Sequence, residues 1–286
     1  MKRQNEKLSK KLIIGIVIAY GFLVAIAVYT LLPILRVVQL SLQPPETYFT
    51  TERALLPQSI TLDNFVKLFS ETNYPKWLFN SMLVASLQTV LTGTACTCAA
   101  YGYTIYNFRG KEKIFLLMLS TMMIPASVGV PALFIFIKIL NLLNTYPSVV
   151  IPGIASVFSL FFMRSYMESA IMKELVDAGR IDGASELGIF YRIILPTLKP
   201  GLAALAIIVF TGSFNEFFWP LLALSTEDMY TVQVGLPTWN VITGAAKIRY
   251  DLLSAGVVVS TIPSLLIFIF LQRYLISGLT FGALKG

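Results

Sequence analysis

Long apolar runs, rather than a regular alternation of apolar and polar positions, dominate the chain. Six such runs are separated by polar segments that contain Lys or Arg. A helix rises about 1.5 Å per residue and the hydrocarbon core of a bilayer is about 30 Å thick, so about 20 apolar residues cross it. The pattern predicts an all-α polytopic membrane protein with six transmembrane helices. The spans are expected at about 12–35, 77–106, 114–137, 146–163, 201–224 and 252–271.

The six spans are expected to form a single transmembrane domain covering residues 1–286, with a long loop at about 36–76. The basic N-terminus, the apolar run after it and the sequence Ala25-Ile26-Ala27 also fit a cleavable signal peptide. Because the run continues unbroken to Leu35, we favour an uncleaved first span. Prolines at positions 33, 125, 131, 152 and 263 interrupt the spans and predict kinks or breaks.

Composition and charge agree with this topology. The 286 residues are 56% hydrophobic and only 13% charged, against roughly 25% charged residues in soluble domains. Of the 22 Lys and Arg residues, fifteen fall on the face that holds both termini, the loop around Arg109 and the segment around Asp177. That face is therefore expected to be cytoplasmic. Topology accounts for the net charge of +7, and nothing indicates nucleic-acid binding.

The chain lacks the residues of common catalytic sites. It has no histidine, no phosphate-binding G-x-x-x-x-G-K-[ST] loop and no G-x-S-x-G nucleophile turn. Cys96 and Cys98 lie two residues apart in the second span, on different faces of the helix, so a disulfide or metal site is not expected. The chain is predicted to be no enzyme and to bind no metal or cofactor itself.

The segment between the fourth and fifth spans, about 168–196, is unusually polar and contains the sequence DAGRIDGASELGIFYRIILP. We expect two short helices with a hinge at Gly183, because glycine accepts backbone angles that other residues avoid. The first helix would carry an apolar stripe of Leu175, Ala178 and Ile181. The second would place Leu187, Phe190 and Ile194 on one side. This block would either dock a partner protein or rest on the lipid headgroups.

The same segment resembles the EAA motif of binding-protein-dependent ABC importer permeases. The motif spacing E-A-A-x3-G-x9-I-x-L-P is met by Asp177-Ala178-Gly179, Gly183, Ile193 and Leu195-Pro196. The resemblance implies a cytoplasmic coupling-helix pair that docks into a separate ATPase. Two positions differ, since Asp177 stands where Glu is usual and Gly179 stands where Ala is usual, at a cost of about 1 kcal/mol in helix propensity. The implied coupling residues are Asp177, Ala178, Gly179, Asp182, Gly183, Ala184, Leu187, Phe190, Ile193, Leu195 and Pro196.

Other pieces resemble the carbohydrate branch of that family, in particular its maltose-permease-like smaller subunit. They are "MIP" at 123–125, "NLLNT" at 141–145, "FNEFFWPLL" at 214–222 and the ending "QRYLISGLTFGALKG" at 272–286, which implies a complete chain. The resemblance implies a prokaryotic inner-membrane subunit with cytoplasmic termini that helps to import a sugar. Its partners would be a second homologous permease, two ATPase subunits that carry ATP and Mg, an extracytoplasmic solute-binding protein and the bilayer.

Polar and aromatic residues within the spans are candidates for the pathway. They are Asn80, Asn215, Glu216, Phe217 and Trp219. The polar ones either line the pathway or tie helices together, and the aromatic ones either stack on sugars or anchor the membrane boundary. The 36–76 loop is either a contact for the solute-binding protein or a spacer. An ion-gradient-driven transporter or channel is the rival function, but a single intramembrane Glu and the lack of visible repeats argue against it.

Overall fold

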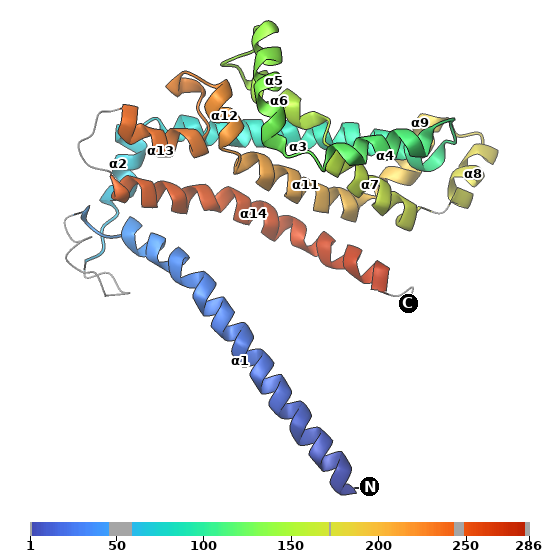
Figure 1. Ribbon diagram of the computed structural model, residues 1–286, viewed down its shortest axis with the longest axis horizontal. Coiled ribbons are helices and arrows are strands. Elements are labelled where there is room, and N and C mark those ends of the chain that lie inside the picture. The colour runs from blue at the N-terminus through green and yellow to red at the C-terminus, as the bar shows by residue number, and fades with distance from the viewer. Residues whose placement is uncertain (1, 46–58, 172, 243–248, 284–286) are drawn as a thin grey trace. The chain divides into compact units, whose positions relative to one another are not determined.

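The computed structural model describes residues 2–45, 59–171, 173–242 and 249–283, and every regular element in these ranges is a helix (Figure 1). The middle of the predicted 36–76 loop and the last three residues of the tail lie outside the described residues. The chain divides into two compact units, which are described separately.

The first unit contains residues 1–72 and 244–259. Its elements are α1 (Lys2–Ser41), α2 (Asp63–Glu71) and the beginning of α14 (Tyr250–Ala283). Buried Asn64 of α2 donates from Nδ2 to the carbonyl oxygens of Ser41 at 3.0 Å and Gln43 at 2.8 Å. These bonds satisfy carbonyls that the end of α1 leaves without helical partners, so they fix where the chain leaves the first helix.

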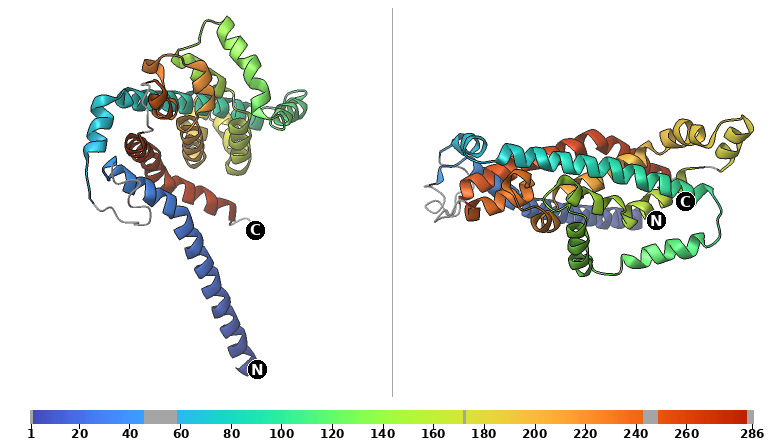
Figure 2. Two further views of the ribbon diagram at one scale, coloured as in Figure 1. Left: turned by 60° about the vertical axis from the view of Figure 1, so that its left-hand side comes forward. Right: turned by 90° about the horizontal axis from the view of Figure 1, so that it is seen from above.

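The second unit contains residues 73–243 and 260–286 and is built around the long helix α3. This helix is Tyr74–Ile105. The other elements that begin in this unit are α4 (Lys111–Thr121), α5 (Ala126–Ile139), α6 (Tyr146–Ile154), α7 (Val157–Ala170), α8 (Lys173–Ile181), α9 (Glu186–Ile189), a π-helical turn (Phe190–Ile194), α10 (Leu195–Thr197), α11 (Lys199–Phe214), α12 (Phe218–Ala223), a 3₁₀ turn (Glu227–Met229) and α13 (Val232–Ile242). Helices α6, α7, α11 and α13 all pack against α3, which runs through the unit in each view (Figures 1 and 2).

Three of the predicted spans are single helices. The apolar stretches Gly15–Ser41, Tyr74–Ile105 and Tyr250–Tyr274 are each long enough to cross a membrane, and they correspond to the first, second and sixth predictions. Three further helix pairs are apolar enough but bent: α4 with α5 by 97°, α6 with α7 by 43°, and the α9–α10 stretch with α11 by 76°. The described residues therefore contain three membrane-spanning candidates, or up to six if each bent pair counts as one.

The span expected at 114–137 is broken next to Pro125, as that proline predicted: α4 ends at Thr121 and α5 begins at Ala126. Pro125 immediately precedes α5; a proline disfavours helical angles at the residue before it and has no N–H to donate. The expected helix at 201–224 is also interrupted, between Phe214 and Phe218. By contrast, the prolines at 33, 131, 152 and 263 lie inside helices.

The expected end of the fourth span at Met163 is too early, since α7 continues to Ala170. Arg164 is accommodated inside the helix because its charge is paired: it donates to Glu168 at 2.8 Å and to Glu112 of α4 at 2.8 Å. Its guanidinium also lies 4.0 Å from the ring centre of Phe115. A buried cation with two carboxylates and an aromatic face does not end the helix, and it links α4 to α7.

Candidate functional site

Helices α8 and α9 form the predicted pair, and Gly183 lies between them. Gly183 has φ of 79°, a left-handed conformation that favours glycine. Ser185 then caps α9, because its Oγ accepts a hydrogen bond from the N–H of Gly188 at 3.1 Å. The sequence thus specifies both the turn and the start of the second helix.

One face of this pair is packed into the second unit. Val176, Ile189 and Phe190 are buried in a cluster with residues of α3 and α7. Gly179 is buried as well, and a Cβ at this position would lie 3.0 Å from Cδ1 of Ile193 and 3.2 Å from Cγ1 of Ile189. The glycine that departs from the usual motif therefore lets α8 approach the following segment closely.

The opposite face of the pair is apolar and exposed. Leu175, Ile181 and Leu187 are 42%, 86% and 70% exposed. The expectation that Leu187 shares a side with Phe190 and Ile194 is wrong, because the latter two are buried. A π-helical turn over Phe190–Ile194 widens the helix after Leu187, and the faces on either side of it no longer align.

A polar network centred on Glu186 ties the pair to the end of α3. Glu186 accepts hydrogen bonds from the hydroxyl of Tyr106 at 2.6 Å and from Nε of Arg180 at 2.8 Å. Arg180 also pairs with Asp177 at 3.2 Å. The Glu186 carboxylate raises the pKa of the Tyr106 hydroxyl by accepting its hydrogen bond and raises the pKa of the Arg180 guanidinium above its usual range. We call these four residues the Glu186 network.

Side chains of α3 donate to backbone carbonyls at the break between α6 and α7. Thr92 donates to the carbonyl of Gly153 at 3.1 Å, and the Cys96 thiol lies 3.5 Å from the carbonyl of Ser156. Ser156 in turn caps α7, accepting from the N–H of Ser159 at 3.2 Å. A broken helix in a membrane needs such donors for the carbonyls it frees. Cys96 therefore contributes a weak donor at this break.

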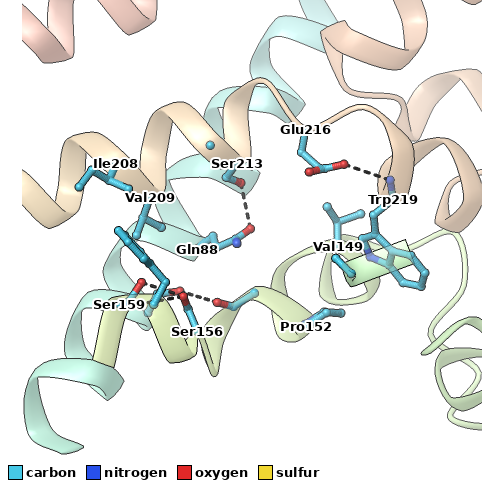
Figure 3. A pocket seen from close by; sticks show the side chains of 15 residues that line it. Gln88, Val149, Pro152, Ser156, Ser159, Ile208, Val209, Ser213, Glu216 and Trp219 are labelled. Carbon is cyan, nitrogen blue, oxygen red and sulfur yellow. Dashed lines mark hydrogen bonds between the residues drawn. The ribbon is translucent and has the colours of Figure 1, made fainter. Parts of the chain in front are cut away.

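A cavity of about 600 Å³ opens beside this break (Figure 3). Residues of α3, α6, α7 and α11 line it, together with Glu216 and Trp219. Gln88 accepts from the hydroxyl of Ser213 at 2.9 Å, and its amide nitrogen would lie 1.8 Å from a Cβ at Gly153. The glycine therefore makes room for the amide that reaches the cavity wall.

Glu216 and Trp219 close the cavity where α11 has ended. Oε1 of Glu216 accepts from the backbone N–H groups of Phe218 at 3.0 Å and Trp219 at 3.3 Å, which begins α12. The indole nitrogen of Trp219 donates to the carbonyl of Ser148 at 2.9 Å and so fixes the ring. The carboxylate explains the break in the expected fifth span, because it satisfies donors of a new helix start.

Asn80 lies elsewhere and is completely buried. Its Nδ2 donates to the carbonyls of Asp228 and Tyr230, each at 2.9 Å, and its Oδ1 accepts from the hydroxyl of Tyr146 at 2.8 Å. Neighbouring Ser81 accepts from the N–H of Val232 at 2.8 Å. We call Asn80, Ser81 and Tyr146 with these backbone partners the Asn80 clamp. It ties α3 and α6 to the segment before α13.

The structure thus separates the five candidate pathway residues. Glu216 and Trp219 line the cavity, Asn215 and Phe217 are exposed without lining it, and Asn80 is in the clamp. A pathway role for each stays a prediction. Gly153 and Ser213, which shape the wall, were not singled out in the sequence; the Pro152-Gly153 pair in the middle of an apolar run was the available signal.

Comparisons with known proteins match most or all of the chain. The family described as "Binding-protein-dependent transport system inner membrane component" matches residues 91–281. The arabinooligosaccharides transport system permease protein AraQ of Halalkalibacterium halodurans is 38% identical over the full length of both chains. The trehalose/maltose transport system permease protein MalG of Thermococcus litoralis is 34% identical over 92% of this chain and 94% of its own.

Solved structures show the same fold. A chain of a bacterial ABC transporter involved in the import of the acidic polysaccharide alginate has a TM-score of 0.80 at 24% identity, covering 92% of this chain and 96% of its own. A chain of the bacterial alginate transporter in complex with its pentasaccharide-bound periplasmic protein has a TM-score of 0.63 at 17% identity, covering 92% and 95%.

Proposed function

Because the chain belongs to the family of inner membrane components of binding-protein-dependent transport systems, we propose that it forms one half of an import pathway for a carbohydrate. In this proposal the chain catalyses no reaction. Separate cytoplasmic ATPase subunits bind ATP and Mg, and α8 with α9 passes their movement to the membrane helices. The named relatives handle arabinooligosaccharides, trehalose and maltose, which supports a sugar or oligosaccharide as the substrate.

The observation that carries the proposal is the exposed apolar face of α8 and α9. Leu175, Ile181 and Leu187 lie on a helix pair whose other face is packed into the unit. An exposed apolar patch with charged neighbours fits a protein partner, and the buried anchor would transmit a push from that partner to α3 and α7. Phe190, Ile193 and Leu195 pack inward, so in this proposal they position the docking face and do not form it.

The proposed topology has six spans and cytoplasmic termini. The bent pairs α4–α5 and α6–α7 then count as one crossing each, and the fifth crossing consists of α11 and the short helix α12 after it, not of one helix over 201–224. The distribution of Lys and Arg supports a cytoplasmic position for α8 and α9. The complete transporter would add a second homologous permease, two ATPase subunits and an extracytoplasmic solute-binding protein.

The test replaces one exposed leucine in the complete transporter. Leu187→Asp places a charge on the proposed docking face, where the residue is 70% exposed and supports no packing of its own chain. We expect the ATPase subunits to be lost when the tagged chain is purified in mild detergent, while the second permease remains bound. ATP-driven uptake of arabinotriose or maltotriose into proteoliposomes should be lost with them.

Ile60→Asp is the matched control, because Ile60 is 72% exposed but lies in the predicted extracytoplasmic loop. This variant should retain the ATPase subunits. Equal retention by both variants would overturn the docking role of α8 and α9. Recovery of the unmodified chain without any ATPase, under conditions that keep a known importer intact, would overturn the proposed function.

A further inference from the structure

We infer that the cavity beside the α6–α7 break is a subsite on this chain for one ring of an uncharged carbohydrate. The inference rests on the proposed function and adds where this subunit contacts the substrate and which sugars it rejects. The cavity volume of about 600 Å³ lies within the range of about 300–1,000 Å³ that is usual for small-molecule sites.

The wall offers one donor and one acceptor that are not used within the chain. Among the described residues, Nε2 of Gln88 and Oε2 of Glu216 have no hydrogen-bond partner, while Oε1 of each side chain accepts a hydrogen bond (Figure 3). Ser213 and the backbone of α12 therefore hold these groups in place. A sugar hydroxyl both donates and accepts, so hydroxyls of a bound sugar can accept from the Gln88 amide and donate to the Glu216 carboxylate.

An apolar surface completes the subsite. The indole nitrogen of Trp219 is already bonded to the carbonyl of Ser148, so this residue offers its ring face and no donor. Phe158 and Val149 add further apolar surface to the lining. A sugar ring has an apolar face of C–H groups and a polar edge of hydroxyls. The cavity wall likewise has an apolar part, formed by Trp219, Phe158 and Val149, and a polar part, formed by Gln88 and Glu216.

The charge on the wall sets the selectivity. A carboxylate at Glu216 repels a carboxylate, phosphate or sulfate group on a sugar. The subsite is therefore selective for neutral sugars. Glu216→Gln removes the charge and keeps a carbonyl oxygen that accepts from the N–H groups of Phe218 and Trp219, so the start of α12 is retained.

Photocrosslinking in the complete transporter tests the location. Phe158 and Phe161 are both on α7 and both 42% exposed, but only Phe158 lines the cavity. Two variants of the complex are prepared, each with the photoreactive residue p-benzoylphenylalanine at one of these positions. Each detergent-purified complex is illuminated in the presence of a tritiated sugar, either arabinotriose or maltotriose, whichever the unmodified complex imports. We expect label at position 158, suppressed by excess unlabelled sugar, and only background label at position 161.

Competition tests the selectivity. Digalacturonate should compete poorly for labelling at position 158 and roughly tenfold better after Glu216→Gln. Import of the sugar with equal labelling at positions 158 and 161 would overturn the location while leaving the proposed function intact. An unchanged competition ratio would overturn the role of Glu216 in selectivity. Import of neither sugar would overturn the proposed function itself.

Discussion

The two ends of α3 hold their neighbouring segments by different chemistry. At its beginning, the Asn80 clamp consists of neutral hydrogen bonds to backbone groups around a fully buried side chain. Near its end, the Glu186 network consists of charged and phenolic side chains that remain largely exposed. A buried polar group that loses its partners costs much more than an exposed ion pair that opens to water.

This difference suits two mechanical roles. The Asn80 clamp fixes α3, α6 and the segment before α13 as one body, because breaking it would leave several buried groups unpaired. The Glu186 network holds α8 and α9 through contacts that exchange easily with water and salt. Under the proposed function, α8 and α9 would receive a partner and tolerate small adjustments at such contacts, whereas the framework that would transmit the movement does not.

The largest effect is expected from a substitution that breaks the Asn80 clamp. Asn80→Ala leaves the carbonyls of Asp228 and Tyr230 and the hydroxyl of Tyr146 without this partner, at a cost of about 3 kcal/mol in the free energy of unfolding. Thermal unfolding of the purified transporter measures this loss. Asn215→Ala is the control, since exposed Asn215 donates to Thr211 at the end of α11 and accepts one long hydrogen bond, of 3.4 Å, from Gln233. Equal losses in the two variants would contradict the clamp.

An intermediate effect comes from the hinge of the helix pair. Gly183→Ala forces a residue with a Cβ into φ of 79°, at a cost of about 1–2 kcal/mol, although nothing lies within 4 Å of the added carbon. We expect roughly tenfold weaker retention of the ATPase subunits, as the helix pair shifts to relieve the strain.

The matched substitution for the hinge is Gly102→Ala, in α3, where a Cβ also meets nothing within 4 Å and φ is not positive. This alanine should leave ATPase retention unchanged, because alanine favours a helix over glycine. Titration of purified ATPase against each variant gives the two affinities. Indistinguishable affinities would show that the left-handed turn does not position the docking face.

The smallest expected effect is at the Glu186 network. Glu186→Gln removes the ion pair with Arg180 but keeps a hydrogen-bond acceptor for Tyr106, so the apparent melting temperature should change by no more than about 2 °C. A double-mutant cycle with Arg180→Gln should give a small coupling energy that decreases in 1 M salt, because the Debye length falls to about 3 Å at that salt concentration and exposed charges are screened. A coupling as large and salt-insensitive as that of the clamp would remove the contrast between the two ends.

Sequence reasoning located the helices where the signal was local. Apolar length alone identified the helices now seen as α1, α3 and α14, since a span has to bury about 20 residues in lipid. The break expected at Pro152 lies close to the observed break before α7, because Pro152 is in the last turn of α6, whereas the break before α12 was not predicted. Both breaks depend on side-chain hydrogen bonds to backbone groups. Thr92 satisfies a carbonyl of Gly153, and the Glu216 side chain starts a new helix.

The candidate site divides in the same way. The helix pair could be predicted because Gly183, Ser185 and the motif spacing all lie within one short stretch of the chain. The role of Asn80 could not, because its partner Asp228 is 148 residues away in the sequence. Composition marks a polar residue in an apolar span as important, but only the fold decides whether it faces a cavity or a backbone.

A substitution at Gly153 could change the cavity wall with little disturbance of the fold. Any side chain there displaces the amide of Gln88, which lies at the end of a flexible chain and moves away easily. A single-base change from a glycine codon to an alanine codon would therefore remove one polar group, the Gln88 amide, from its present place on the cavity wall. If the cavity is the proposed subsite, substrate preference can change through a wall residue that has no side chain of its own, because its substitution moves a neighbouring side chain.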